Sequence, residues 1–192
     1  MWYDNKKILL ASKSPRRQQL IKELGIPTDI IAIDVDESID IATPLIAETL
    51  AKRKADAFKA HLSDNEILIT ADTIVSYGDK KLGKPHSRDE AFRMLSQLSG
   101  AKHTVFTGVC IKTSRKQTSF TELTHVWFRE LSDEEISHYI DCYKPFDKAG
   151  AYGIQEWIGM IGIEHIEGCY YNVMGLPVAR LYRELKELLS AQ

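Results

Sequence analysis

An apolar run that leads straight into a polar turn is the feature that most constrains the fold of this 192-residue chain. The run Ile8–Ala11 is followed directly by Ser12–Arg17, whose sequence is SKSPRR. Ser14 suits the N-cap of a helix, and Pro15 suits the first helical position, where a missing N–H costs nothing. Gly25 marks the end of the helix. The order predicts a strand, a tight turn and a helix.

The same turn carries groups that bind anions. Two hydroxyls, on Ser12 and Ser14, and two guanidinium groups, on Arg16 and Arg17, lie where the helix dipole is positive and backbone N–H groups are unpaired. Phosphate is the expected anion. The alternative is a capped helix with solvated arginines, although Arg in a first turn is electrostatically unfavourable unless an anion is bound there.

Composition and charge exclude several classes of protein. Hydrophobic residues make up 44% and charged residues 27% of the chain, which is typical of a globular protein with one compact domain or two small lobes. The net charge of −2, with no basic block, argues against binding of a nucleic acid polymer. Three cysteines without CxxC spacing indicate neither a disulfide framework nor a zinc site.

No segment of the sequence indicates export or a membrane. The N-terminal residues, 1–7, lack the order of a signal peptide, and no apolar run approaches the ~18 residues that a membrane-spanning helix requires. We therefore expect a cytoplasmic protein.

Helical and strand patterns alternate along the chain, which predicts an α/β fold with a mixed sheet and flanking helices. Helices are expected after a Thr-Pro cap at Thr43, after capping boxes at Ser87 and Ser132, and from Pro177. Strands are expected at 66–75, 103–113 and 118–128, the last two as an antiparallel pair.

Features outside the first turn also point to chemistry. Asp72 is a charge inside the apolar strand 66–75, which is costly unless the carboxylate is paired, binds a metal or serves as a general base. An exposed strand end is the alternative. The acidic run Asp34–Glu37 has Asp36 and Glu37 placed to share a hard cation, or it is a solvated turn.

Two lysines and a glutamine complete the candidates. Lys84 follows a short turn and could reach a phosphate as a point charge; Lys54, on the helix after Thr43, is similar, and both could equally be solvated. Gln155 ends the Gly-rich stretch 147–155, whose small residues allow a backbone to approach a flat ligand. Its amide can match the edge of a pyrimidine base, unless it is a surface glutamine.

Familiar nucleotide-binding and hydrolase motifs do not occur in the sequence. It contains no GxxxxGK[ST], no GxGxxG that opens a helix after a strand, and no GxSxG. Hydrolysis would therefore use an activated water rather than a covalent serine.

Taken together, the segments resemble the Maf family of nucleoside triphosphate pyrophosphatases. The matching segments occur in the family's order and cover nearly the whole chain: Ala11–Arg17, Asp36-Glu37, Lys54-Ala55, Ala71–Val75, Gly83–Pro85, Leu98–Gly100, Asp147–Gln155 and Asn172–Pro177. Three markers resemble the dTTP and UTP pyrophosphatases rather than the relatives that act on 7-methyl-GTP: Ser14–Arg17, Ala71–Thr73 and Ala151–Gln155. After Gln155 the family often has small residues, whereas this chain has Glu156-Trp157.

The resemblance implies one domain over residues 1–192, with two lobes around a deep cleft, related to the inosine-triphosphate pyrophosphatases. It implies hydrolysis of dTTP and UTP, or of modified pyrimidine triphosphates, at the α-phosphate to the monophosphate and pyrophosphate, as house-cleaning of nucleotide pools. Mg²⁺ or Mn²⁺ would bind Asp36, Glu37 and Asp72, and a homodimer is expected.

The resemblance also assigns roles to residues. Asp72 would activate the water, while the turn from Ser12 to Arg17 and Lys84 would hold the phosphates, with Lys54 assisting. Gln155 and Thr73 would select the base. The alternative is a nucleotide-binding regulator of septum formation with little turnover, although such a sensor has no need of a carboxylate inside the strand at the phosphates.

Overall fold

The computed structural model describes residues 3, 5–39, 41 and 43–190. Met1, Trp2 and Asp4, which belong to the segment considered as a signal peptide, lie outside the described residues. No described helix is both long and apolar enough to cross a membrane.

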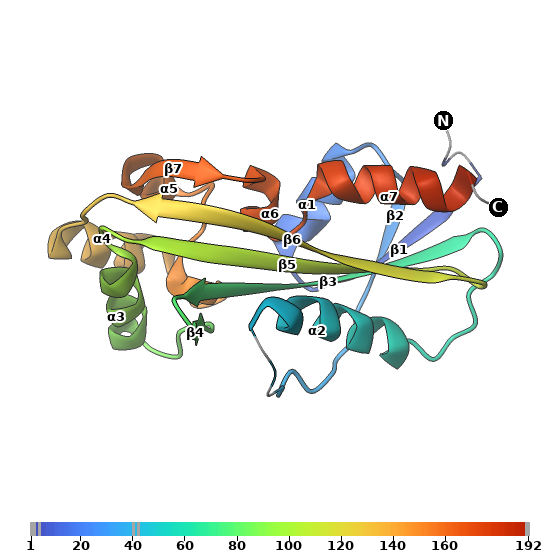
Figure 1. The fold of residues 1–192 in the computed structure, drawn as a ribbon, viewed down its shortest axis with the longest axis horizontal. Coiled ribbons are helices and arrows are strands. Elements are labelled where there is room, and N and C mark those ends of the chain that lie inside the picture. Colours follow the sequence, from blue (N-terminus) through green and yellow to red (C-terminus); the bar gives the residue numbers. More distant parts are fainter. Residues whose placement is uncertain (1–2, 4, 40, 42, 191–192) are drawn as a thin grey trace. The chain divides into compact units, whose positions relative to one another are not determined.

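The described elements form a seven-stranded mixed sheet with flanking helices, which confirms the predicted fold class (Figure 1). The strand order is β2-β1-β3-β5-β6-β7, and β4 pairs with β3. Strand β1 is parallel to β2 and to β3, whereas β4 is antiparallel to β3 and β7 is antiparallel to β6. The strands are β1 (Lys7–Ala11), β2 (Thr28–Ile31), β3 (Glu66–Tyr77), β4 (Lys80–Leu82), β5 (Lys102–Lys112), β6 (Gln117–Phe128) and β7 (Ile163–Glu167).

The helices are α1 (Pro15–Glu23), α2 (Thr43–Ala57), α3 (Arg88–Leu98), α4 (Asp133–Tyr143), the 3₁₀ turn η1 (Ala149–Ala151), α5 (Trp157–Gly162), α6 (Tyr170–Met174) and α7 (Val178–Ser190). Helices α1, α2, α3, α4 and α7 begin close to the predicted positions, whereas the short helical segments η1, α5 and α6 were not predicted. The capping box at Ser132 is complete. At Ser87 only half of the box forms, because the Glu90 carboxylate accepts from the backbone N–H of His86 instead.

The chain divides into two compact units. Unit 1 comprises residues 1–72, 107–122 and 175–192, and unit 2 comprises residues 73–106 and 123–174. The boundary between the first two segments falls inside β3, between Asp72 and Thr73.

Unit 1 covers both faces of its parallel strands. Helix α2 lies on one face of the strands, and α1 and α7 lie on the other (Figure 1). Alternate side chains of a strand point to opposite faces, so a strand that is covered on both sides is apolar throughout. Residues Ile8–Ala11 of β1 are all buried, and Leu9 and Ala11 pack in one cluster with Ala51 and Ala55 of α2.

The register of the parallel strands brings two sequence features together. Ala11 of β1 pairs with Thr70 of β3, so the turn that begins at Ser12 and the residue Asp72 both follow the carboxyl end of the parallel β1–β3 pairing, while β3 itself continues to Tyr77. In parallel α/β sheets this carboxyl end is where ligands bind.

Unit 2 has its own core. A cluster of buried apolar side chains joins α3 and α4 to β3, β5 and β6, with Leu95, Val105, Val126 and Ile136 all fully or almost fully buried. The 149–158 segment closes this cluster through Tyr152, Ile154 and Ile158.

Candidate active site

The turn after β1 is held by its own serine. Ser12 is 7% exposed, and its hydroxyl accepts a hydrogen bond from the backbone N–H of Ser14 at 3.2 Å. Its carbonyl accepts from the side-chain amide of Gln18 at 3.0 Å. Ser14 occupies the predicted N-cap position and Pro15 the first helical position, but the Ser14 hydroxyl makes no capping hydrogen bond. The hydrogen bonds of Ser12 therefore stabilise the turn, and a capping hydrogen bond of Ser14 does not.

Arg17 fastens this turn to the strand that carries Asp72. Its Nε donates to the carbonyl of Gly175 at 2.7 Å, and its Nη1 donates to the carbonyl of Ala71 at 2.9 Å. Burial lowers the pKa of the Arg17 guanidinium, while the nearby charge of Asp72 acts in the opposite direction. Arg17 therefore positions the residue next to Asp72, a role that the sequence pattern did not reveal. Arg16 is half-buried on the same helical turn.

Asp72, Lys54 and Glu37 meet in unit 1. The carboxylate of Asp72, which is 8% exposed as a residue, accepts from the Lys54 ammonium at 2.5 Å. The same ammonium lies 2.8 Å from Glu37 Oε1, and the Lys54 side chain is only 12% exposed. The alternatives of an exposed strand end for Asp72 and a solvated lysine for Lys54 are therefore wrong: β3 continues to Tyr77, and α2 directs Lys54 inward.

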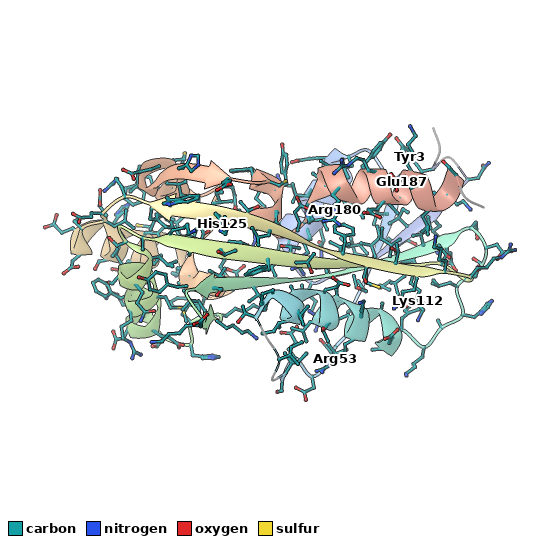
Figure 2. The ribbon with its side chains drawn as sticks, in the orientation of Figure 1. Tyr3, Arg53, Lys112, His125, Arg180 and Glu187 are labelled. Carbon is teal, nitrogen blue, oxygen red and sulfur yellow. The ribbon has the colours of Figure 1, made fainter. Side chains whose placement is uncertain are left out.

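The acidic run separates into side chains with different partners. Asp34 pairs with Lys13 at 2.7 Å, and the Asp36 carboxylate accepts from the backbone N–H of Ser38 at 2.9 Å. That backbone hydrogen bond lowers the pKa of Asp36. Arg53, labelled on α2 in Figure 2, donates to the backbone carbonyl of Asp36 at 2.6 Å. Asp36 thus takes part in a local turn, and Glu37 is the residue of this run that pairs with Lys54.

The donor set of Asp72 and Glu37 suits a divalent cation. Two carboxylates surround one ammonium, which leaves a local surplus of one negative charge, and carboxylate oxygens are the ligands that Mg²⁺ and Mn²⁺ prefer. Within the described ranges no three His, Cys, Asp or Glu side chains gather as a metal site. Asp72 and Glu37 are the two expected ligands that lie on one ammonium, and the part of Asp36 in a cation site stays a prediction.

In unit 2, the loops that carry Lys84 and Gln155 are tied together. The backbone N–H of Gly150 donates to the carbonyl of Gly83 at 3.0 Å. Gly150 has φ of +71°, and a Cβ added there would lie 3.0 Å from Cγ1 of Val75. The absence of a side chain at Gly150 thus allows the backbone to pack closely against Val75 of β3. Lys84 is exposed, and Thr73 is half-buried in β3.

Gln155 presents a buried acceptor. The residue as a whole is half-buried, but its Oε1 atom is shielded from solvent and has no hydrogen-bond partner among the described residues. A buried carbonyl oxygen without a donor is destabilising, so such atoms are rare in folded proteins. The alternative of a fully solvated surface glutamine is therefore wrong, because the Oε1 atom of Gln155 is buried. This oxygen could accept a hydrogen bond from a ligand.

A buried lysine in the same segment escaped the sequence reasoning. Lys148 is 7% exposed, and its ammonium pairs with Asp147 at 2.8 Å and with Glu156 at 3.1 Å. The Asp-Lys pair at the start of the Gly-rich stretch was the only available signal. Trp157, two residues after Gln155, packs against the ring of His138 at 4.9 Å between centroids.

Comparisons with known proteins agree with the motifs. The family model described as "Maf-like protein" matches residues 7–188. A dTTP/UTP pyrophosphatase of Bacteroides thetaiotaomicron is 52% identical over 188 residues, covering 96% of this chain and 97% of that protein. A protein of the same name from Parabacteroides distasonis is 53% identical over 183 residues, covering 94% and 95%. Among solved structures, the Staphylococcus aureus Ham1 protein aligns with a TM-score of 0.43 and 15% identity over 67% of this chain and 73% of that chain, which is too distant to support an argument.

Proposed function

The chain belongs to the Maf family, and on this premise we propose that it hydrolyses dTTP and UTP to the monophosphate and pyrophosphate. The names of relatives that are about 50% identical over nearly their whole length support this assignment. Modified pyrimidine triphosphates fall within the same proposal. The alternative of a regulator without turnover receives no support from those names.

The observation that carries the proposal is the ion-paired group of Asp72, Lys54 and Glu37, in which Asp72 is buried. A carboxylate at the end of a parallel strand pair, held at a fixed place by an ammonium at 2.5 Å, is suited to take a proton from water. The activated water then attacks the α-phosphorus, and pyrophosphate leaves. Ser12, Ser14 and Arg16 would bind phosphate oxygens at the start of α1, and Lys84 would add a point charge.

A divalent cation belongs to the proposal. Mg²⁺ or Mn²⁺ held by Glu37 and Asp72 would neutralise negative charge on the phosphate oxygens. Lys54 contacts the same two carboxylates, so its ammonium holds them in place for the cation as well.

Gln155 would read the base. Uracil and thymine carry an N3–H donor, whereas N3 of cytosine is an acceptor. The buried Oε1 of Gln155 lacks a donor, so it would bind N3–H of uracil or thymine and face a second acceptor with cytosine. A site of this kind rejects the wrong base because its buried polar groups stay unpaired. Thr73 would add a hydroxyl to the same selection.

The test is pyrophosphate release by the purified protein with Mg²⁺ or Mn²⁺ across UTP, dTTP, CTP, GTP, ATP and 7-methyl-GTP. We expect turnover of UTP and dTTP that is lost in Asp72→Asn, by a factor of about 10² to 10⁴ for removal of a general base. The matched control is Asp64→Asn, which removes a carboxylate of unit 1 that is 73% exposed and pairs with Arg115. Tight binding of UTP without turnover would support the regulator instead.

The expected homodimer is part of the same proposal. Sedimentation velocity of the protein over a range of concentrations tests it, and a monomer at all concentrations would contradict it.

A further inference from the structure

A hydroxyl on α4 anchors the segment that carries Gln155. Tyr139 is fully buried, and its hydroxyl donates to Glu156 Oε2 and accepts from the backbone N–H of Gly153 at 3.0 Å. The other carboxylate oxygen of Glu156 pairs with the buried ammonium of Lys148 at 3.1 Å. One hydroxyl therefore binds the chain two residues before Gln155 and one residue after it.

The turn between these anchor points is tight. The backbone N–H of Glu156 donates to the carbonyl of Gly153 at 3.0 Å, which closes the turn around Gln155. A Cβ added at Gly153 would lie 2.8 Å from Cδ of Glu156 and 3.2 Å from Nε2 of Gln155. The side chains of Glu156 and Gln155 are thus packed against the glycine backbone, so a shift of either anchor moves the glutamine amide.

The Tyr139 hydroxyl remains protonated at neutral pH. Burial and the hydrogen bond to Glu156 both raise the pKa of Tyr139 above its ordinary value. It therefore acts as a permanent donor to the carboxylate. Glu156 is the N-cap residue of α5, but its side chain makes no capping hydrogen bond and is directed to Tyr139 and Lys148 instead.

We propose that Tyr139 is a positioning residue for base selection, because its hydroxyl fixes the Gly153–Glu156 turn that presents the unpaired Oε1 of Gln155. This inference rests on the proposed function. Tyr139 contacts neither base nor phosphate in it and acts only through Gln155. Removing the hydroxyl leaves the Gly153 N–H and Glu156 Oε2 without their partner, and the turn then shifts to find new ones.

The test is the ratio of kcat/KM for UTP to kcat/KM for CTP in Tyr139→Phe. A displacement of the amide on the order of 1 Å is expected to lower this ratio by about ten- to a hundredfold. A purely structural role would lower turnover of both substrates by the same factor and leave the ratio unchanged. The matched control is Tyr143→Phe, which removes a hydroxyl from a 39% exposed tyrosine that stacks on Tyr139 in the same helix.

A second variant covers the case in which Tyr139→Phe does not fold. In Glu156→Asp the shorter side chain can no longer reach both Tyr139 and Lys148, so the UTP:CTP ratio should fall in the same way. An unchanged ratio in a folded variant overturns the inference and leaves the proposed function intact. A wild-type protein that does not prefer UTP to CTP refutes the proposed function, and this inference with it.

Discussion

Replacing Gln155 with methionine should separate stability from selectivity. The Oε1 atom of Gln155 is buried without a hydrogen-bond partner. In the ligand-free protein its loss of hydration therefore destabilises the fold, and no hydrogen bond offsets this loss. Methionine has nearly the same length and shape but no polar atom that demands a partner. We therefore expect the Gln155→Met variant to be more stable than the wild type and less selective for UTP over CTP.

The magnitude follows from the burial of this one atom. A buried polar group without a partner costs roughly 1–3 kcal/mol. The lower end applies here because the residue as a whole is only half-buried. A gain of about 1 kcal/mol corresponds to a rise in Tm of about 2–4 °C for a chain of this size. Selectivity should move the other way, with the UTP:CTP ratio of kcat/KM falling at least about tenfold, since N3–H then has no acceptor.

Two assays on one preparation check this prediction. Thermal unfolding gives Tm, and pyrophosphate release from UTP and CTP gives the ratio. The control is Gln97→Met, which alters an exposed glutamine on α3 in the same unit and should change neither value. A lower Tm together with an unchanged ratio would show that Oε1 is paired in solution and that Gln155 does not read the base.

Three further predictions concern packing, pH and thiol reactivity. Gly108→Ala should lower Tm by roughly 6–12 °C, for a loss of about 3 kcal/mol, because the added Cβ would lie 2.2 Å from backbone atoms of α2. In the control Gly83→Ala the Cβ meets nothing within 4 Å, so an equal drop would refute the packing argument. Burial lowers the pKa of His103 to about 3. Its neutral ring therefore contributes stability that is present above pH ~6.5, and the free energy of unfolding decreases by up to about 1.4 kcal/mol per pH unit as the pH falls towards 3. Urea unfolding at several pH values should show a smaller dependence of this free energy on pH in His103→Gln. Burial raises the pKa of the Cys110 thiol to about 12, whereas Cys142 is exposed. Iodoacetamide at about pH 8 should label the exposed Cys142 but not the buried Cys110 in the native protein, as peptide mass spectrometry would show, and rapid labelling of Cys110 would contradict its burial.

Local sequence patterns predicted the longer helices well because the boundaries of these helices have local causes. Pro15 begins α1, Gly25 has φ of +71° just after it, and the Ser132 box begins α4 as expected. Two kinds of difference remain: the short segments η1, α5 and α6 were not predicted as helices, and two polar side chains depart from the expected caps. The Ser14 hydroxyl does not cap α1, and the Glu90 carboxylate turns to the N–H of His86.

The candidate site was predicted residue by residue but not as a set of contacts. Motif positions pointed to Asp72, Lys54 and Glu37 separately, and the structure joins them through one ammonium. The same motifs grouped Asp36 with these carboxylates, whereas Asp36 accepts from the N–H of Ser38. A cluster of acidic residues in the sequence does not show which carboxylate will pair with Lys54, since that depends on the path of the chain between strand and helix.

The sequence by itself determined the order of strands and helices, the turn after β1 and the family, because these depend on neighbours along the chain and on motifs in register. Only the tertiary structure decided what each buried polar group contacts. Arg17 reaches Ala71 and Gly175, and Tyr139 reaches Gly153 and Glu156, over separations from 14 to 158 residues. A buried polar atom without a partner is destabilising, so each of these groups must form a hydrogen bond within the folded protein. Its partner depends on how distant segments pack together, which local sequence patterns do not reveal.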